Sequence, residues 1–136
     1  MNSAQIIQNT ISFVKETLKG AEGGHDFFHV ERVYRNALSI AKDENVDSFV
    51  VSLGALLHDI ADAKFYNGDE SIGPKMARAF LESQHVEEDI IVHIENIIQY
   101  ISFKTSFSFF RNTRTMCLLS VLSKTICCVS VVISAL

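Results

Sequence analysis

The sequence contains only one proline, Pro74, among its 136 residues. Proline interrupts helices, so its scarcity leaves long segments that can be helical. Hydrophobic residues make up 48% of the chain and charged residues 21%, which favours a globular helical domain over a disordered chain. A chain of this length is enough for a single hydrophobic core but not for two.

The sequence also lacks an excess of positive charge, a signal peptide and a metal-binding cysteine pattern. Its net charge of −4 argues against a nucleic-acid polymer as a partner. Residues 1–12 lack a basic end followed by an apolar run, and the three cysteines form no CxxC pair. These features predict a cytoplasmic protein, because reduced cysteines are the default in that compartment.

Acidic residues and histidines are absent after residue 104, where the composition changes sharply. Residues 1–104 carry 9 basic and 16 acidic groups, net −7, whereas residues 105–136 carry 3 and 0, net +3. All three cysteines lie in the second segment. This break predicts that one domain occupies residues 1–104 and that residues 105–136 form an atypical tail.

Two explanations for the tail are open. One is a shifted reading frame or an alternative exon after about Lys104, which would change composition and charge together. The other is a membrane anchor, because residues 116–136 are long enough to span a bilayer and carry a single charge, Lys124. That lysine would cost about 2.5–3.5 kcal/mol in mid-membrane. We therefore favour the first explanation and do not expect a membrane partner.

Hydrophobic periodicity before the break predicts about five helices and no strands, hence an all-α bundle. The first helix is defined by Ile7, Ile11, Val14 and Leu18 and ends at Gly20. The others are expected over about 26–44, 47–60, 74–83 and 86–101, with a loop over 62–73. The third is apolar almost throughout, as expected for a helix at the centre of a bundle.

Two groups of polar residues carry the chemistry. His25 and His29 are four residues apart, so on a helix both side chains lie on one face. A simpler role is also open for this group, because Asp26 is a good N-cap and the segment could merely begin a helix. The second group is His58 and Asp59, at the polar end of the most apolar predicted helix.

His58 and Asp59 are the stronger indication of a metal site. Burying an imidazole and a carboxylate without partners would cost several kcal/mol, and a divalent cation would be a suitable partner for both. Imidazole and carboxylate together suit Mn, Fe, Ni or Zn, and Mg where oxygen ligands and water dominate. His85 and His93 have no ligand partner at a useful spacing, so we expect them at the surface.

Four separated strings match HD-domain phosphohydrolases in order: HDFFHVERV (25–33), ALLHDIADAKF (55–65), GDES (68–71) and ISFK (101–104). Over about residues 3–104 the sequence resembles that superfamily, and within it the small bacterial-type branch similar to nucleoside triphosphate pyrophosphohydrolases. The resemblance implies an HD-domain helical bundle with a divalent metal held by His29, His58 and Asp59. It also implies a substrate pocket lined by His25, Asp62, Lys64, Ser102 and Lys104.

The residue types fit phosphoryl chemistry. Asp59, Asp62 and Lys64 are the candidate catalytic residues, with Asp62 as a general base or as a group that orients a histidine. Arg32 and Lys64 could bind substrate by neutralising charge on phosphate oxygens. Simpler roles are open for both: Arg32 could pair with Asp26, and Lys64 could be solvated.

The sequence departs from the pattern at one ligand. The resemblance implies a further metal-binding aspartate downstream of the ISFK string, and this chain has no aspartate, glutamate or histidine after Glu95. We therefore predict a lineage that hydrolyses nucleotides, most simply a nucleoside triphosphate to monophosphate and pyrophosphate, with impaired activity in this chain. The alternatives are a non-catalytic metal- or nucleotide-binding module, which could form a homodimer, and an inactive truncated variant.

Overall fold

The computed structural model describes residues 2–20, 26–61 and 66–102. These residues form helices and no strand, so the all-α prediction is confirmed. In chain order the helices are α1 (Ser3–Thr17), α2 (Phe27–Ala41), α3 (Ser48–Leu57), α4 (Ile72–Ser83) and α5 (Glu88–Ser102).

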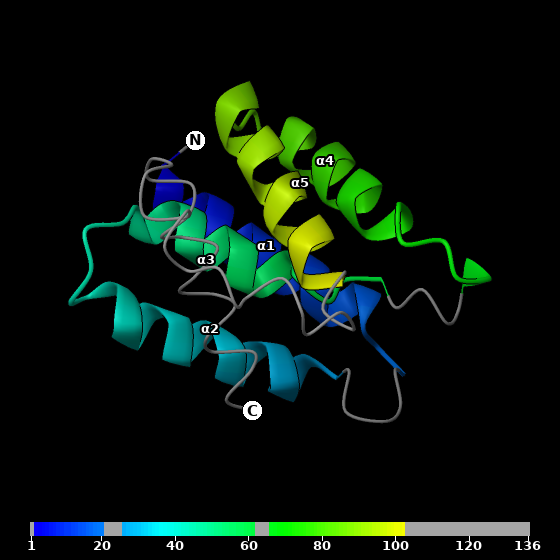
Figure 1. Cartoon of the computed structure of the whole chain (residues 1–136), viewed down its shortest axis with the longest axis horizontal. Helices are drawn as coiled ribbons and strands as arrows, with labels where there is room; N and C mark the ends of the chain where they lie inside the picture. Colours follow the sequence, from blue (N-terminus) through cyan, green and yellow to red (C-terminus); the bar gives the residue numbers. More distant parts are fainter. Residues whose placement is uncertain (1, 21–25, 62–65, 103–136) are drawn as a thin grey trace, which may run out of the picture.

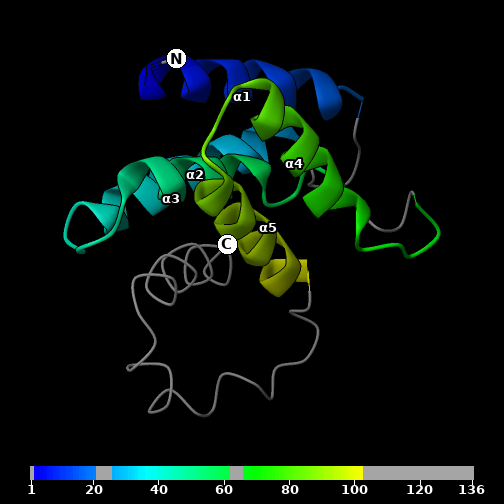
Figure 2. The ribbon, with the colours of Figure 1, turned by 90° about the horizontal axis from the view of Figure 1, so that it is seen from above.

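Helix α3 lies in the middle of the bundle, with α1, α2 and α5 packed around it (Figures 1 and 2). Every residue of α3 from Val50 to Leu57 is buried, as the apolar sequence of this helix predicts. The side chain of Asp47 caps the start of α3 by accepting a hydrogen bond from the backbone N–H of Phe49 at 2.8 Å. Helix α4 packs mainly on α5 and runs beside it (Figure 1).

Helix α1 presents a slightly different face to the core from the one that its aliphatic residues predict. The buried positions are Ile6, Thr10 and Val14, while Ile7 and Ile11 are only partly buried. Thr10 can occupy the buried face because its hydroxyl donates a hydrogen bond to the carbonyl of Ile6 at 2.8 Å. A satisfied hydroxyl costs little to bury, so a polar residue stands where the pattern favoured an aliphatic one.

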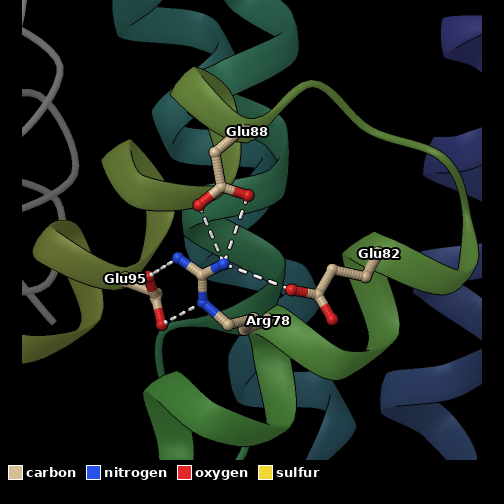
Figure 3. A network of polar contacts seen from close by, with 4 residues as sticks. All are labelled: Arg78, Glu82, Glu88 and Glu95. Carbon is tan, nitrogen blue, oxygen red and sulfur yellow. Dashed lines mark hydrogen bonds and ion pairs between the residues drawn. The ribbon is translucent and has the colours of Figure 1, made fainter.

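A charged cluster centred on Arg78 joins α4 to α5 (Figure 3). The guanidinium binds both carboxylate oxygens of Glu95 on α5, at 2.9 and 2.6 Å. It also contacts Glu82 at 3.2 Å and Glu88 at 2.9 Å. These hydrogen bonds raise the pKa of Arg78 further above its already high value. The cluster fixes α4 against a helix that itself packs on α3.

In the part of the chain that the structure describes, no helix is both long enough and apolar enough to cross a membrane. The predicted domain boundary near Lys104 and the candidate anchor at residues 116–136 lie outside the described residues.

Candidate metal centre

The start of α2 positions His29. Asp26 is the N-cap of this helix, and its side chain accepts a hydrogen bond from the backbone N–H of His29 at 3.0 Å. The carbonyl of Asp26 accepts the N–H of Val30 at 3.3 Å. Val30 is fully buried against the core, whereas His29 is partly exposed at the edge of the buried face. The predicted capping role of Asp26 is therefore present, and it fixes the backbone of a candidate ligand.

The end of α3 positions His58 and Asp59. The helix ends at Leu57, and both residues lie in the turn that follows. His58 is only 6% exposed, and its Nδ1 lies 2.7 Å from the carbonyl oxygen of Ala55. A carbonyl can only accept, so Nδ1 carries the proton in a neutral ring and Nε2 carries the lone pair. Such a hydrogen bond is the usual way in which a metal-binding histidine is oriented.

The two segments bring three donor groups together. One nitrogen from each of His29 and His58 and one carboxylate oxygen of Asp59 lie within 4.8 Å of one another. The rings of His29 and His58 have their centroids 5.6 Å apart and are inclined at 56°. Two donors that each bind the same cation at about 2.2 Å lie no more than about 4.4 Å apart. The three donors therefore need at most a small side-chain movement to bind one ion together.

The donor set fits a divalent cation. Two imidazoles and one carboxylate supply a single negative charge and leave further coordination positions for water or a substrate oxygen. The donors therefore suit a cation that meets substrate, and the role of the three residues as ligands remains a prediction.

Arg32 follows His29 by one helical turn and is exposed. The structure gives it no ion pair with Asp26, the simpler role that the sequence left open. Together with Phe28 and Asn36 it lines a shallow groove of about 200 Å³ on the outer side of α2. Phe28 is 76% exposed, an unusual position for a large apolar side chain.

Several predicted site residues cannot be placed. His25, Asp62, Lys64 and Lys104 lie outside the described residues, and Ser102 is the last residue of α5. Their roles in the pocket remain predictions.

His93 corrects one expectation. It was expected at the surface, but it is partly buried, and its Nε2 atom is enclosed with no hydrogen-bond partner in the described structure. Burial lowers the pKa of His93, although the nearby carboxylate of Asp47 acts in the opposite direction. The sequence did carry a signal, because His93 precedes the fully buried Ile97 by four residues and so shares its helix face. His85 is exposed, as expected.

The HD domain family model matches residues 26–119, more than half of the chain, and the protein belongs to this family. A crystal structure of an HD-superfamily hydrolase from Bacillus thuringiensis is similar, with a TM-score of 0.69 and 30% identity, over 95% of this chain. The uncharacterized protein YpgQ of Bacillus subtilis (strain 168) is 40% identical over 53 residues, 39% of this chain. The matched regions span 57% of the first protein and 26% of the second.

Proposed function

We propose that the protein is a metal-dependent phosphohydrolase whose substrate is a nucleotide, most simply a nucleoside triphosphate cleaved to monophosphate and pyrophosphate. The observation that carries the proposal is the convergence of His29, His58 and Asp59 within 4.8 Å at the junction of α2 and α3. Membership of the HD domain family supports the same class of reaction. The nucleotide and the bond cleaved rest on the sequence resemblance.

Each of the described site residues would have a separate role in metal binding or in phosphate binding. His29, His58 and Asp59 would hold the cation, which when bound supplies Lewis acidity and lowers the pKa of water toward neutrality. The hydrogen bond from His58 to Ala55 holds the ring of His58 in one orientation, so the site is set before substrate arrives. Arg32, exposed one turn along α2 from His29, would neutralise charge on phosphate oxygens.

Two further roles belong to residues outside the described segments. Asp62 follows the metal-binding turn by three residues and would act as a general base or orient a ligand. Lys64 would add a second positive charge beside the phosphates. His25, Ser102 and Lys104 would complete the substrate pocket.

We also propose that this chain is impaired. Three candidate ligands lie at the junction, but the sequence offers no carboxylate or imidazole after Glu95 to act as a fourth. Because the loss of a residue that merely supports a ligand costs about 10- to 100-fold in metal affinity or activity, the loss of a ligand should cost at least as much.

The test combines metal content with product analysis. We expect purified protein supplied with Mn²⁺ to retain close to one ion per chain at high metal concentration, and His58→Ala to retain none. Nucleoside triphosphate should yield monophosphate and pyrophosphate slowly, in a metal-dependent manner. Release of inorganic phosphate instead of pyrophosphate would contradict the assigned bond. A protein that binds no ion under any condition would contradict the metal centre itself.

A non-catalytic binding module is the second candidate, and the missing fourth ligand is the observation that favours it. In that case Mn²⁺ and nucleotide would bind together with no product over long incubation. The nucleotide sequence across codons 100–136, read in all three frames, bears on the same question. An aspartate-containing helix in another frame would indicate that an active form differs from this chain only in its tail.

A further inference from the structure

The described residues contain a second cavity, which the proposed function does not use. It has a volume of about 320 Å³ and lies between α1 and α2. These two helices hardly touch each other, although both pack on α3, so a gap remains between them with α3 as its floor. The volume is at the small end of the range for sites that bind small molecules, about 300–1,000 Å³. We call this cavity the α1–α2 pocket.

The α1–α2 pocket is separate from the candidate metal centre. None of the three candidate ligands lines it. Phe27 and Glu31 of its α2 wall flank His29 in sequence, but Glu31 lies about 200° further around the helix. The two sites therefore occupy different sides of α2, and a ligand in one would not touch the cation in the other.

Part of the pocket lining is apolar. Leu56 of α3, which is fully buried, forms the floor, and Ile11 and Phe27 form parts of the two walls. Ile11 and Phe27 are only partly covered by the rest of the described chain. An apolar ligand body would cover the remaining area of these side chains, and the removal of that area from water would favour binding.

The rim of the pocket carries an excess of positive charge. Arg35 is already paired with Glu31 at 2.9 Å, so these two charges offset each other. Lys15 contacts no carboxylate among the described residues, and its ammonium lies over the ring of Phe27, 4.7 Å from the centroid. A lysine held in this way places its ammonium at the mouth of the pocket, where an anion could replace water as its partner.

We propose that the α1–α2 pocket binds a small organic anion, a molecule with one negative group and a compact apolar or aromatic body. The negative group would be bound by Lys15 at the rim. The body would lie on Leu56, Ile11 and the ring of Phe27. This site is independent of the phosphohydrolase assignment and would exist in a protein with no activity.

Three probes that differ in charge and in apolar body test the proposal on the full chain, in the presence of a chelator. Benzoate carries both features, benzamide has the same shape without the charge, and inorganic phosphate has charge without an apolar body. Binding is followed by NMR through the backbone amides. We expect saturable shifts with benzoate in the millimolar range, centred on Ile11, Lys15 and Phe27. Benzamide should bind about five-fold more weakly or worse, and phosphate should not bind there.

Variants separate the pocket from general charge effects. Lys15→Gln should weaken benzoate binding by about five-fold or more, and Lys15→Glu further, without changing benzamide binding. Lys19→Gln is the matched control, because Lys19 is an exposed lysine paired with Glu16 and does not line the cavity. His58→Ala should leave benzoate binding unchanged even where it abolishes metal binding. Equal affinity for benzoate and benzamide, shifts centred on His58, or no saturable shift would overturn the proposal.

Discussion

The carboxylate of Asp26 accepts a hydrogen bond from the backbone N–H of His29, at 3.0 Å. The Asp26 side chain thus caps α2 and holds the backbone of its first turn, which contains the candidate metal ligand His29. Helix stability and ligand position are linked through one hydrogen bond, because an uncapped first turn frays and would carry His29 with it.

Asp26→Ala should therefore have two effects. Loss of the cap should lower the free energy of unfolding by about 1 kcal/mol. Looser placement of His29 should also weaken Mn²⁺ binding, by about 10-fold. Denaturant unfolding and metal titration measure these effects separately.

Asp47→Ala is the matched control for that change, because Asp47 caps α3 in the same manner, at the end of the helix remote from His58. It should cost a similar free energy of unfolding and leave Mn²⁺ affinity unchanged. Asp26→Asn keeps a capping oxygen and should recover most of the stability. Equal loss of metal affinity in the Asp26 and Asp47 variants would mean that the effect is only global destabilisation.

Metal binding should itself stabilise the fold, because the three donors come from two segments, the start of α2 and the turn after α3, that unfolding would separate. At a free Mn²⁺ concentration 100 times the dissociation constant, the gain is about 2.7 kcal/mol. Thermal unfolding with and without the ion measures it. His58→Ala should abolish the gain, while His85→Asn, at an exposed position with a positive φ of 56°, should retain it. A gain that survives in His58→Ala would place the ion elsewhere.

Arg32 offers a test of substrate contact that does not depend on turnover. Its side chain is exposed, one turn along α2 from His29, so Arg32→Gln should fold normally. We expect the dissociation constant of a nucleoside triphosphate, measured with Mn²⁺ present, to rise by about 10-fold, because a charge-assisted contact to phosphate is lost. Mn²⁺ affinity in the absence of nucleotide should not change. Lys42→Gln, at the opposite end of α2, is the control and should leave nucleotide affinity as it is.

Arg78 should matter for stability rather than for the metal centre. Its guanidinium is held by carboxylates of α4 and α5, including the bidentate pair with Glu95. We expect Arg78→Gln to lower Tm more than Arg35→Gln, whose ion pair with Glu31 is far more exposed. High salt should reduce the difference, because ions screen the partly exposed members of the cluster. No difference between the two variants would indicate that the cluster contributes nothing to the packing of α4.

Much of this molecule follows from its hydrophobic pattern. The continuous apolar run from Val50 to Leu57 predicted a central helix, and Pro74 predicted the start of α4 to within a few residues. Strong hydrophobic periodicity predicts that a segment is helical, but it does not predict the residue at which the helix ends. The third helix was expected to continue to Ile60 and stops at Leu57, because the chain turns at His58.

The geometry of the candidate site could be predicted from the sequence only in part. Residue types indicated a metal site at His58 and Asp59, and the family resemblance implied His29 as a further ligand. No sequence rule, however, places the end of one helix against the start of another. The carbonyl of Ala55 that orients His58 could not be foreseen either, since every residue has a carbonyl. It is one of the last four of α3, which lack partners within a helix. The surface position predicted for His93 is wrong for a different reason. A histidine without a partner ligand at a useful spacing can still lie on the buried face of a helix.

His93 makes the stability of the fold sensitive to mild acid. Burial lowers the pKa of its imidazole in the folded state below the ordinary value of 6.5, while the unfolded chain keeps that value. As the pH falls below about 6.5, the unfolded state takes up the proton first, so the free energy of unfolding decreases. The contribution of His93 is fully present above that pH and is lost on acidification. For one proton the slope is at most about 1.4 kcal/mol per pH unit, and partial exposure of the ring reduces it.

His93→Leu removes the titrating group and the enclosed Nε2 atom together. We expect the variant to lose less stability than the unmodified protein between about pH 7.5 and about pH 5.5, and to be at least as stable at the higher pH. Denaturant unfolding at the two values, with a chelator present, measures the difference and keeps the metal centre out of the comparison. His85→Asn should retain the full pH dependence, since His85 is exposed. If His93→Leu loses as much stability on acidification as the unmodified protein, the burial of His93 does not govern the response to pH.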